Sequence, residues 1–234
     1  MGLDLGAAGL REYGRRFGYE REILFELPVR ISRLEGDAGF LSDPIALANS
    51  AYGQGQLLAT PLQVLLTSAT IANGGVTPGP YLVNEVRTPS GAVVQRNNPD
   101  DLGRAVSPET AQLMIGIMVQ TVENGSGRNA RIEGVQVAGK TGTAQLGGEL
   151  DPHAWFTAFA PADDPQVAVV VLVENGGEGS VVGADRVPDA DGGTGSWAMS
   201  VGTRSIVERV VHPLQPDHAA IFKDMQHRHD ARPH

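Results

Sequence analysis

The run Val-Ala-Val-Val-Val-Leu-Val at 167–173 constrains the fold more than any other segment. It is apolar at every position and rich in β-branched residues, which favour strands. A strand without alternation between apolar and polar residues has both faces buried, so it lies centrally in a sheet with helices packed on each side. The sequence therefore predicts a layered protein with a sheet at its centre.

Two further strand candidates precede this run, at 135–145 and 153–160. Gly147-Gly148 lies between the first two candidates, and Ala162-Asp163-Asp164-Pro165 lies between the second and third. Such short, turn-rich connections predict an antiparallel meander, because parallel strands need long crossovers. The expected fold class is α+β, an antiparallel sheet with helices on both faces.

Three helices are predicted from one start signal, a capping residue followed by proline. The signal occurs at Asp43-Pro44, Thr60-Pro61 and Ser107-Pro108. The residues 62–72 after the second signal are apolar almost all round, which indicates a buried helix. Further elements are predicted as follows: an amphipathic helix over 4–17, a hairpin of 81–87 with 92–95, a loop over 175–195, and a last helix over 196–211.

Composition excludes several classes of function. The net charge is -9, and clustered lysines and arginines for a nucleic-acid backbone are lacking, so no nucleic-acid partner is expected. No cysteine is present, which removes disulfides and thiolate chemistry. We expect neither a cofactor nor a metal: the aspartates at 185, 189 and 191 fit an ordinary polar loop, and the histidines at 227, 229 and 234 fit a disordered tail.

The first predicted strand is unusually polar, and its residues 139–143 read Gly-Lys-Thr-Gly-Thr. Such a strand suits a sheet edge, where unpaired N–H and C=O groups can bind an added peptide strand. Three other segments accompany it in order: Tyr-Gly-Gln-Gly at 52–55 and Thr-Pro-Leu-Gln at 60–63 precede it, and His-Ala-Trp-Phe-Thr-Ala-Phe-Ala-Pro follows at 153–161. This arrangement resembles the Lys-Thr-Gly region of class B penicillin-binding proteins, over most of residues 1–175.

The resemblance implies a role for each residue of the motif. Lys140 would supply positive field for a substrate carboxylate, and Thr141 and Thr143 would supply hydroxyl donors. Gly142 would allow close approach of a peptide backbone, and the N–H of Thr143 would form half of an oxyanion hole. The family consists of peptidoglycan D,D-transpeptidases, which cross-link stem peptides through a seryl acyl-enzyme and bind penicillin during cell-wall synthesis and cell division. The implied partners are therefore stem peptides and β-lactams.

Two motifs of that family are missing from the sequence. The chain has only two lysines, Lys140 and Lys223, and Val137 and Ala220 stand three residues before them, so no Ser-x-x-Lys exists. No Ser-x-Asn exists either. We therefore expect residues 1–211 to form a partial transpeptidase domain without the first strands and the nucleophile helix, followed by a flexible polar tail at 212–234.

A domain of this kind would leave the apolar strand at 166–174 with one flat, unpaired edge. That edge predicts a chain that is poorly stable alone, dimeric, or completed by its missing N-terminal portion or another cell-wall synthesis protein. Alternative functions are a non-catalytic module that binds peptidoglycan peptides or a partner, and an inactive remnant. The family is membrane-anchored and extracytoplasmic, whereas this sequence shows no signal and no apolar run long enough to span a membrane.

Overall fold

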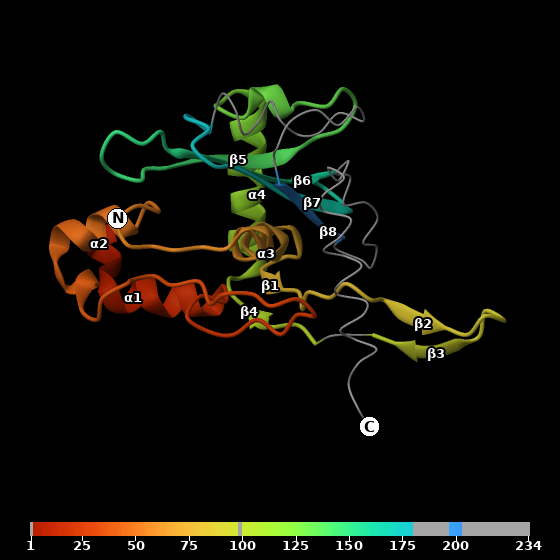
Figure 1. Ribbon diagram of the computed structural model, residues 1–234. Helices are drawn as coiled ribbons and strands as arrows, with labels where there is room; N and C mark the ends of the chain where they lie inside the picture. The colour runs from red at the N-terminus through yellow and green to blue at the C-terminus, as the bar shows by residue number, and fades with distance from the viewer. Residues whose placement is uncertain (1, 98–99, 180–196, 203–234) are drawn as a thin grey trace.

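The computed structural model describes residues 2–97, 100–179 and 197–202 and shows a four-stranded sheet with helices packed against it (Figure 1). The helices are α1 (Gly2–Arg16), α2 (Pro44–Ser50), α3 (Pro61–Ala72) and α4 (Pro108–Glu123), with short 3-10 turns η1 (Phe40–Ser42) and η2 (Arg128–Ala130). The strands are β1 (Val76–Thr77), β2 (Glu85–Arg87), β3 (Val93–Arg96), β4 (Gly103–Arg104), β5 (Ala138–Ala144), β6 (His153–Ala160), β7 (Val167–Val173) and β8 (Trp197–Gly202). No helix of the described residues is both long and apolar enough to cross a bilayer.

The three predicted start signals begin three helices. Asp43 accepts hydrogen bonds from the backbone N–H groups at the start of α2, Thr60 accepts one at 3.2 Å in α3, and Ser107 accepts one at 3.2 Å in α4. Each cap satisfies donors that have no partner within the helix. The predicted helix over 4–17 is also present as α1, although Gly6 interrupts its regular backbone with φ of 72°.

The main sheet is antiparallel throughout, in the order β5-β6-β7-β8. The predicted meander is confirmed, with Lys140 opposite Thr157 and Thr157 opposite Val170. Among the described residues β5 has one neighbouring strand only, so the polar strand lies at an edge as predicted. The apolar strand β7 lies between two others.

Two predictions about the C-terminal part are wrong. Residues 197–202, expected at the start of a helix, form strand β8, and β8 pairs with β7 from Val167 opposite Gly202 to Leu172 opposite Trp197. The second edge of β7 is therefore paired, and the argument for a dimer through that edge no longer holds. The reason is that a long apolar edge with unsatisfied N–H and C=O groups stabilises whatever segment can pair with it. Residues 203–211 and the predicted tail at 212–234 lie outside the described residues, as does most of the predicted loop over 175–195.

Side-chain alternation divides the core into two clusters on opposite faces of the sheet. On the first face, Phe159 and Val170 pack with Leu65 and Ala69 of α3. On the second face, Phe156 and Val171 pack with Val122 of α4 and Ala130 of η2. Because α4 also supplies Met118 and Val119 to the first cluster, helical packing covers both faces, in agreement with the predicted class. The buried helix α3 is confirmed, since Leu65, Leu66 and Ala69 are completely buried.

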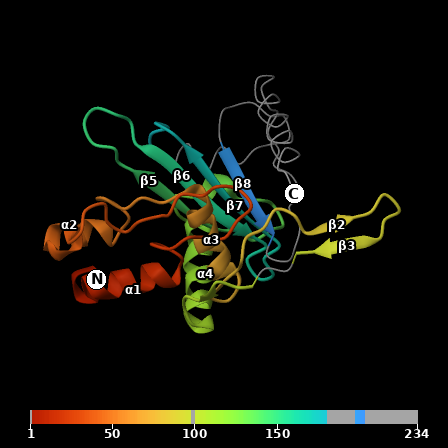
Figure 2. The same ribbon diagram turned by 60° about the horizontal axis from the view of Figure 1, so that its bottom comes forward.

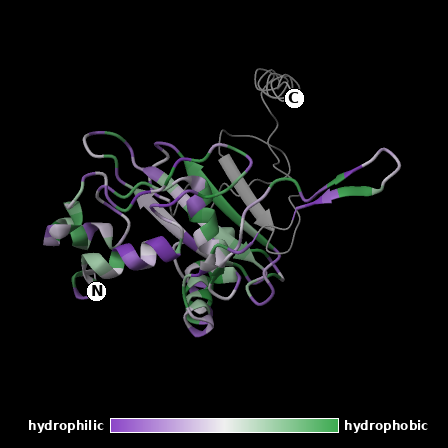
Figure 3. Ribbon diagram, turned by 90° about the horizontal axis from the view of Figure 1, so that it is seen from below, coloured by the Kyte–Doolittle hydropathy of each residue, from purple (hydrophilic) through white to green (hydrophobic). Residues whose placement is uncertain are grey.

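The remaining elements extend from this core in two directions. Both Figure 1 and Figure 2 place α1 and α2 on one side of the molecule and the β2–β3 hairpin on the other. The hairpin confirms the turn prediction in shortened form, with Glu85 opposite Arg96. Figure 3 shows that the apolar residues gather in α3 and the middle of the sheet, whereas α1 carries a strongly hydrophilic stretch.

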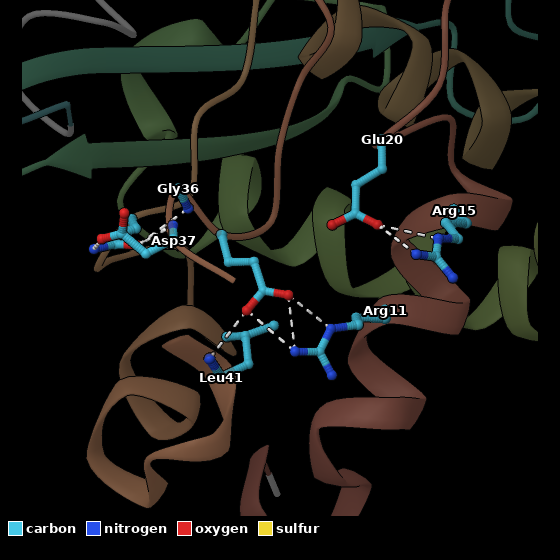
Figure 4. A network of polar contacts seen from close by, with 8 residues as sticks. Arg11, Arg15, Glu20, Gly36, Asp37 and Leu41 are labelled. Atoms are coloured by element: carbon cyan, nitrogen blue, oxygen red, sulfur yellow. Dashed lines mark hydrogen bonds and ion pairs between the residues drawn. The ribbon is translucent and has the colours of Figure 1, made fainter. Parts of the chain in front are cut away.

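A partly buried carboxylate links α1 to the segment that leads into α2 (Figure 4). Glu35 accepts two hydrogen bonds from the guanidinium of Arg11, at 2.8 and 3.1 Å, and one from the backbone N–H of Leu41 at 3.2 Å. Desolvation raises the pKa of the Glu35 carboxyl group, but the hydrogen bonds from Leu41 and Arg11 and the charge of Arg11 outweigh it. The net result is a pKa below the ordinary value, so folding favours the ionised form.

Replacing Glu35 by glutamine is expected to reduce the free energy of unfolding by about 1 kcal/mol at pH 7, because one charge-assisted contact is lost at a partly buried site close to the surface. A carboxyl whose pKa is lowered by folding stabilises the protein above its unfolded-state pKa and loses that contribution as pH falls through the folded-state pKa. The difference between wild type and Glu35→Gln should therefore shrink below about pH 4.5. Urea denaturation at pH 7 and at pH 3.5 measures it, and an equal difference at both values would contradict the assignment.

Candidate functional site

The motif residues 140–143 all lie on the edge strand β5, with Lys140 exposed and the other three half-buried. Alternation places Lys140 on the face that carries α3, opposite Thr157 of β6. Thr141 and Thr143 lie on the other face, because Thr141 pairs with Phe156. The lysine and the two threonine side chains thus start from opposite faces of one strand, which the motif alone did not indicate.

Lys140 stands on a firmly held part of the sheet. Its Nζ donates to the backbone oxygen of Thr141 at 2.5 Å. Its cross-strand neighbour Thr157 donates to the Val169 oxygen at 3.0 Å and shares a 2.7 Å hydrogen bond with Ser68 of α3. Ser68 is buried, so this hydroxyl pair fixes the strand behind the lysine while the ammonium group stays accessible to an anion.

The hydroxyl groups of Thr141 and Thr143 each have a hydrogen-bond partner outside the strands of the sheet. Thr141 Oγ1 lies 2.7 Å from Ser126 Oγ, just after α4. Thr143 Oγ1 accepts a hydrogen bond of 3.1 Å from the N–H of Gly179. Sequence reasoning missed Ser126 and Gly179, and neither residue type carries a recognisable signal on its own. A hydroxyl engaged as an acceptor can still donate its proton to a ligand.

Two glycines bring neighbouring groups close to β5. A Cβ on Gly139 would lie 2.8 Å from Phe156 Cζ and 3.0 Å from Val122 Cγ2. The Phe156 ring can therefore pack against the strand only because residue 139 has no side chain. A Cβ on Gly179 would lie 1.9 Å from the oxygen of Gly142, where the chain crosses the strand. Close packing of this kind holds the motif in one backbone position.

Gln54 is the second element of the site, and the sequence alone does not predict its contact with β5, although it lies in the Tyr-Gly-Gln-Gly segment at 52–55. Its Nε2 donates to the backbone oxygen of Thr143 at 2.8 Å, and its Oε1 accepts from the N–H of Gln145 at 3.4 Å. The oxygen of Thr143 thus faces away from β6. The N–H groups of Thr141 and Thr143 point the same way, because N–H and C=O of one strand residue share a direction.

The edge therefore presents one exposed cation and a row of outward backbone donors. Such a row can bind an extended peptide. A carbonyl oxygen of that peptide that points toward β5 at Thr143 would accept a hydrogen bond from the backbone N–H of Thr143. No group of three or more His, Asp or Glu side chains suited to a metal is found in the described part of the chain. The hollow along α1 is lined by four arginines, but Arg11, Arg15 and Arg16 pair with glutamates and Arg21 binds the Leu102 oxygen.

Comparison with known proteins identifies the family. The penicillin-binding protein transpeptidase domain model matches residues 1–188, slightly more of the chain than the resemblance over 1–175. The chain is 40% identical over 181 residues to peptidoglycan D,D-transpeptidase PbpA of Mycolicibacterium smegmatis, covering 76% of this chain and 36% of the relative. It is 33% identical to stage V sporulation protein D of Bacillus subtilis, with 75% and 28% covered.

Solved structures give the same picture. Penicillin-binding protein A from M. tuberculosis, as a ceftriaxone acyl-enzyme complex, has a TM-score of 0.71 and 38% identity and covers 79% of this chain and 42% of that one. The D,D-transpeptidase domain of a peptidoglycan glycosyltransferase from Eggerthella lenta has a TM-score of 0.70 and 33% identity, with 79% and 46% covered. The chain spans less than half the length of these proteins. From the matched residues, the overall fold and the edge strand together, the chain belongs to the penicillin-binding protein transpeptidase domain family.

Proposed function

We propose that these 234 residues form the substrate-binding side of a peptidoglycan D,D-transpeptidase site. The ligand is an extended stem peptide, or a penicillin in its place, held along the outer edge of β5. The relatives' names support the reaction class, and the acyl-enzyme complex with ceftriaxone supports the β-lactam as a ligand class. As part of the same proposal, the site works outside the cytoplasmic membrane, where peptidoglycan is made.

One observation carries the proposal: exposed Lys140 and the outward N–H of Thr143 lie on the outer edge of β5, three residues apart. The ammonium group of Lys140 attracts the carboxylate of the peptide or the penicillin. The peptide backbone pairs with the outward N–H of Thr141 in the manner of an added strand, since the Thr141 oxygen already accepts a hydrogen bond from Lys140 Nζ. The N–H of Thr143 donates to the carbonyl oxygen on which negative charge develops during acyl transfer.

The nucleophile is supplied from outside these 234 residues, since the sequence contains no Ser-x-x-Lys and no Ser-x-Asn. Acyl transfer needs a serine whose proton passes to an adjacent base, and both groups belong to the first of these motifs in the family. On this proposal the chain alone binds its ligands reversibly. Peptidoglycan peptides and β-lactams then compete for the same edge.

The test is the intact mass of the folded chain after incubation with penicillin G, combined with amide NMR spectra of residues 139–145. We expect no covalent adduct, and reversible, concentration-dependent shifts confined to β5 and its neighbours. The hairpin residues 85–96 provide an internal control, because they lie on the far side of the molecule and should not shift. Absence of shifts on β5 would overturn the proposed function. A stoichiometric adduct lost on mutation of one serine or threonine would show that the nucleophile lies within this chain.

A further inference from the structure

The residues 174–179 after β7 form a strap that runs from the end of that strand to the binding strand β5. At its far end the buried Gly179 donates its N–H to Thr143 Oγ1 at 3.1 Å. At its near end Asn175 donates its N–H to Nδ1 of His153 at 3.0 Å. We propose that His153 is a positioning residue, which fastens the strap so that Gly179 orients the Thr143 hydroxyl for the ligand. This inference rests on the proposed function, which places the ligand along β5.

The near end of the strap is a tight turn that is held from outside at two points. Asn175 has φ of 51° and Gly177 has φ of 82°, both in the left-handed region, which asparagine and glycine adopt more readily than other residues. The N–H of Gly177 donates to the Pro152 oxygen at 3.0 Å, next to the contact of Asn175 with His153. Two successive residues at the start of β6 therefore fix the direction in which the strap leaves the turn.

The far end of the strap lies directly against the sheet. A Cβ on Gly179 would stand 1.9 Å from the Gly142 oxygen and 2.8 Å from the Trp155 oxygen, so only glycine lets the chain come this close. The contact with Thr143 uses a side-chain oxygen and leaves the outward N–H of that residue to the ligand. A small displacement of the strap would break the contact, because a hydrogen bond weakens steeply once its distance and angle depart from the ordinary values.

The orientation of the Thr143 hydroxyl matters because a hydroxyl group both donates and accepts. The N–H of Gly179 occupies one lone pair of Thr143 Oγ1, so the hydroxyl proton points elsewhere and can be donated to a carboxylate or carbonyl oxygen of the ligand. Accepting one hydrogen bond also polarises the O–H group and makes it a better donor. His153 acts on this group only through the strap. Its Nδ1 can accept from Asn175 because a neutral imidazole that carries its proton on Nε2 has a free lone pair there.

Amide hydrogen exchange without ligand tests whether His153 fastens the strap. His153→Leu removes the acceptor, whereas His153→Asn keeps an acceptor atom at the position of Nδ1. In His153→Leu we expect the amides of Asn175, Gly177 and Gly179 to exchange about tenfold faster than in wild type, and in His153→Asn to stay near wild type. Gln95→Leu, on the exposed strand β3, is the control and should leave all three unchanged. Unchanged exchange in His153→Leu, faster exchange at Asn175 alone, or equal acceleration in both His153 variants would overturn the inference.

Titration with penicillin G, followed by amide NMR, tests whether the strap acts on the ligand. His153→Leu should weaken reversible binding about threefold to tenfold, and His153→Asn should keep most of the affinity. In a Thr143→Val background, which lacks the hydroxyl but keeps Lys140 and the backbone N–H, His153→Leu should change the affinity by less than about twofold. An equal loss in both backgrounds would show that His153 does not act through the hydroxyl.

A second variant reaches the strap from its other end. Gly179→Ala leaves His153 unchanged, but its methyl group cannot fit against the Gly142 oxygen, so the far end of the strap must move. We expect a loss of penicillin affinity of the same size as in His153→Leu, and unchanged affinity would overturn the positioning role. If wild type binds no penicillin, the proposed function and the positioning role fail together, while the exchange data still decide whether His153 holds the strap.

Discussion

Phe156→Ala is expected to lower the free energy of unfolding by about 3–5 kcal/mol, the largest effect of any single change discussed for this chain. The ring is completely buried on the second face of the sheet. It packs with Val122 of α4 and Val171 of β7, and it fills the space left by the absent side chain of Gly139. Truncation leaves a cavity that strands on both sides prevent from closing, so the loss includes a cavity contribution as well as the transfer of apolar surface.

Urea denaturation followed by circular dichroism measures this effect, with Leu24→Ala as the control. Leu24 is 78% exposed, so its truncation should change the free energy of unfolding by no more than about 0.5 kcal/mol. A loss below about 1 kcal/mol for Phe156→Ala would contradict close packing of α4 against this face. Because Phe156 lies opposite Thr141, the variant should also loosen the edge strand.

Lys140→Glu is expected to weaken reversible binding of penicillin or of a D-alanine-ended peptide by about 10-fold to 100-fold, since it replaces a charge-assisted contact with a repulsive one. Stability should change little, because Lys140 is exposed. Lys140→Arg keeps the charge and should retain most of the affinity.

Titration followed by amide NMR measures this affinity, and the other lysine of the chain offers the matched control. Lys223→Glu changes the net charge by the same amount, so any nonspecific effect of charge would appear in both variants. Equal loss in the two variants would show that Lys140 has no local role. Raising the salt concentration should reduce the affinity of wild type more than that of Lys140→Gln, because the attraction is electrostatic.

The sequence predicted the parts of the fold that depend on local chemistry. Helix starts at Asp43, Thr60 and Ser107 follow from the side chain that satisfies the first N–H groups, so three residues suffice to recognise each one. The position of β7 also follows from one segment, because a fully apolar strand is stable only between two others. The polar edge strand was recognised for the complementary reason.

The parts that could not be predicted depend on distant partners. Residues 197–202 have no strong strand pattern, and their conformation is decided by the edge of β7 with which they pair. Gln54 looks like any loop glutamine, and only the folded chain shows that it meets the Thr143 oxygen. The roles proposed for Lys140 and Thr143 rest on resemblance and geometry together, and the titrations described above test the role of Lys140.

The pairing of β8 with β7 has a consequence for the order in which the sheet forms. Strands β5, β6 and β7 are joined by short turns, whereas 23 residues separate the end of β7 from the start of β8. Closing the longer connection costs more chain entropy, so the three-stranded meander forms first and β8 is added late. By the same reasoning β8 detaches at a lower free energy than the rest of the sheet opens. Each such event uncovers the most apolar strand of the molecule, so self-association should depend on how often β8 detaches rather than on global unfolding.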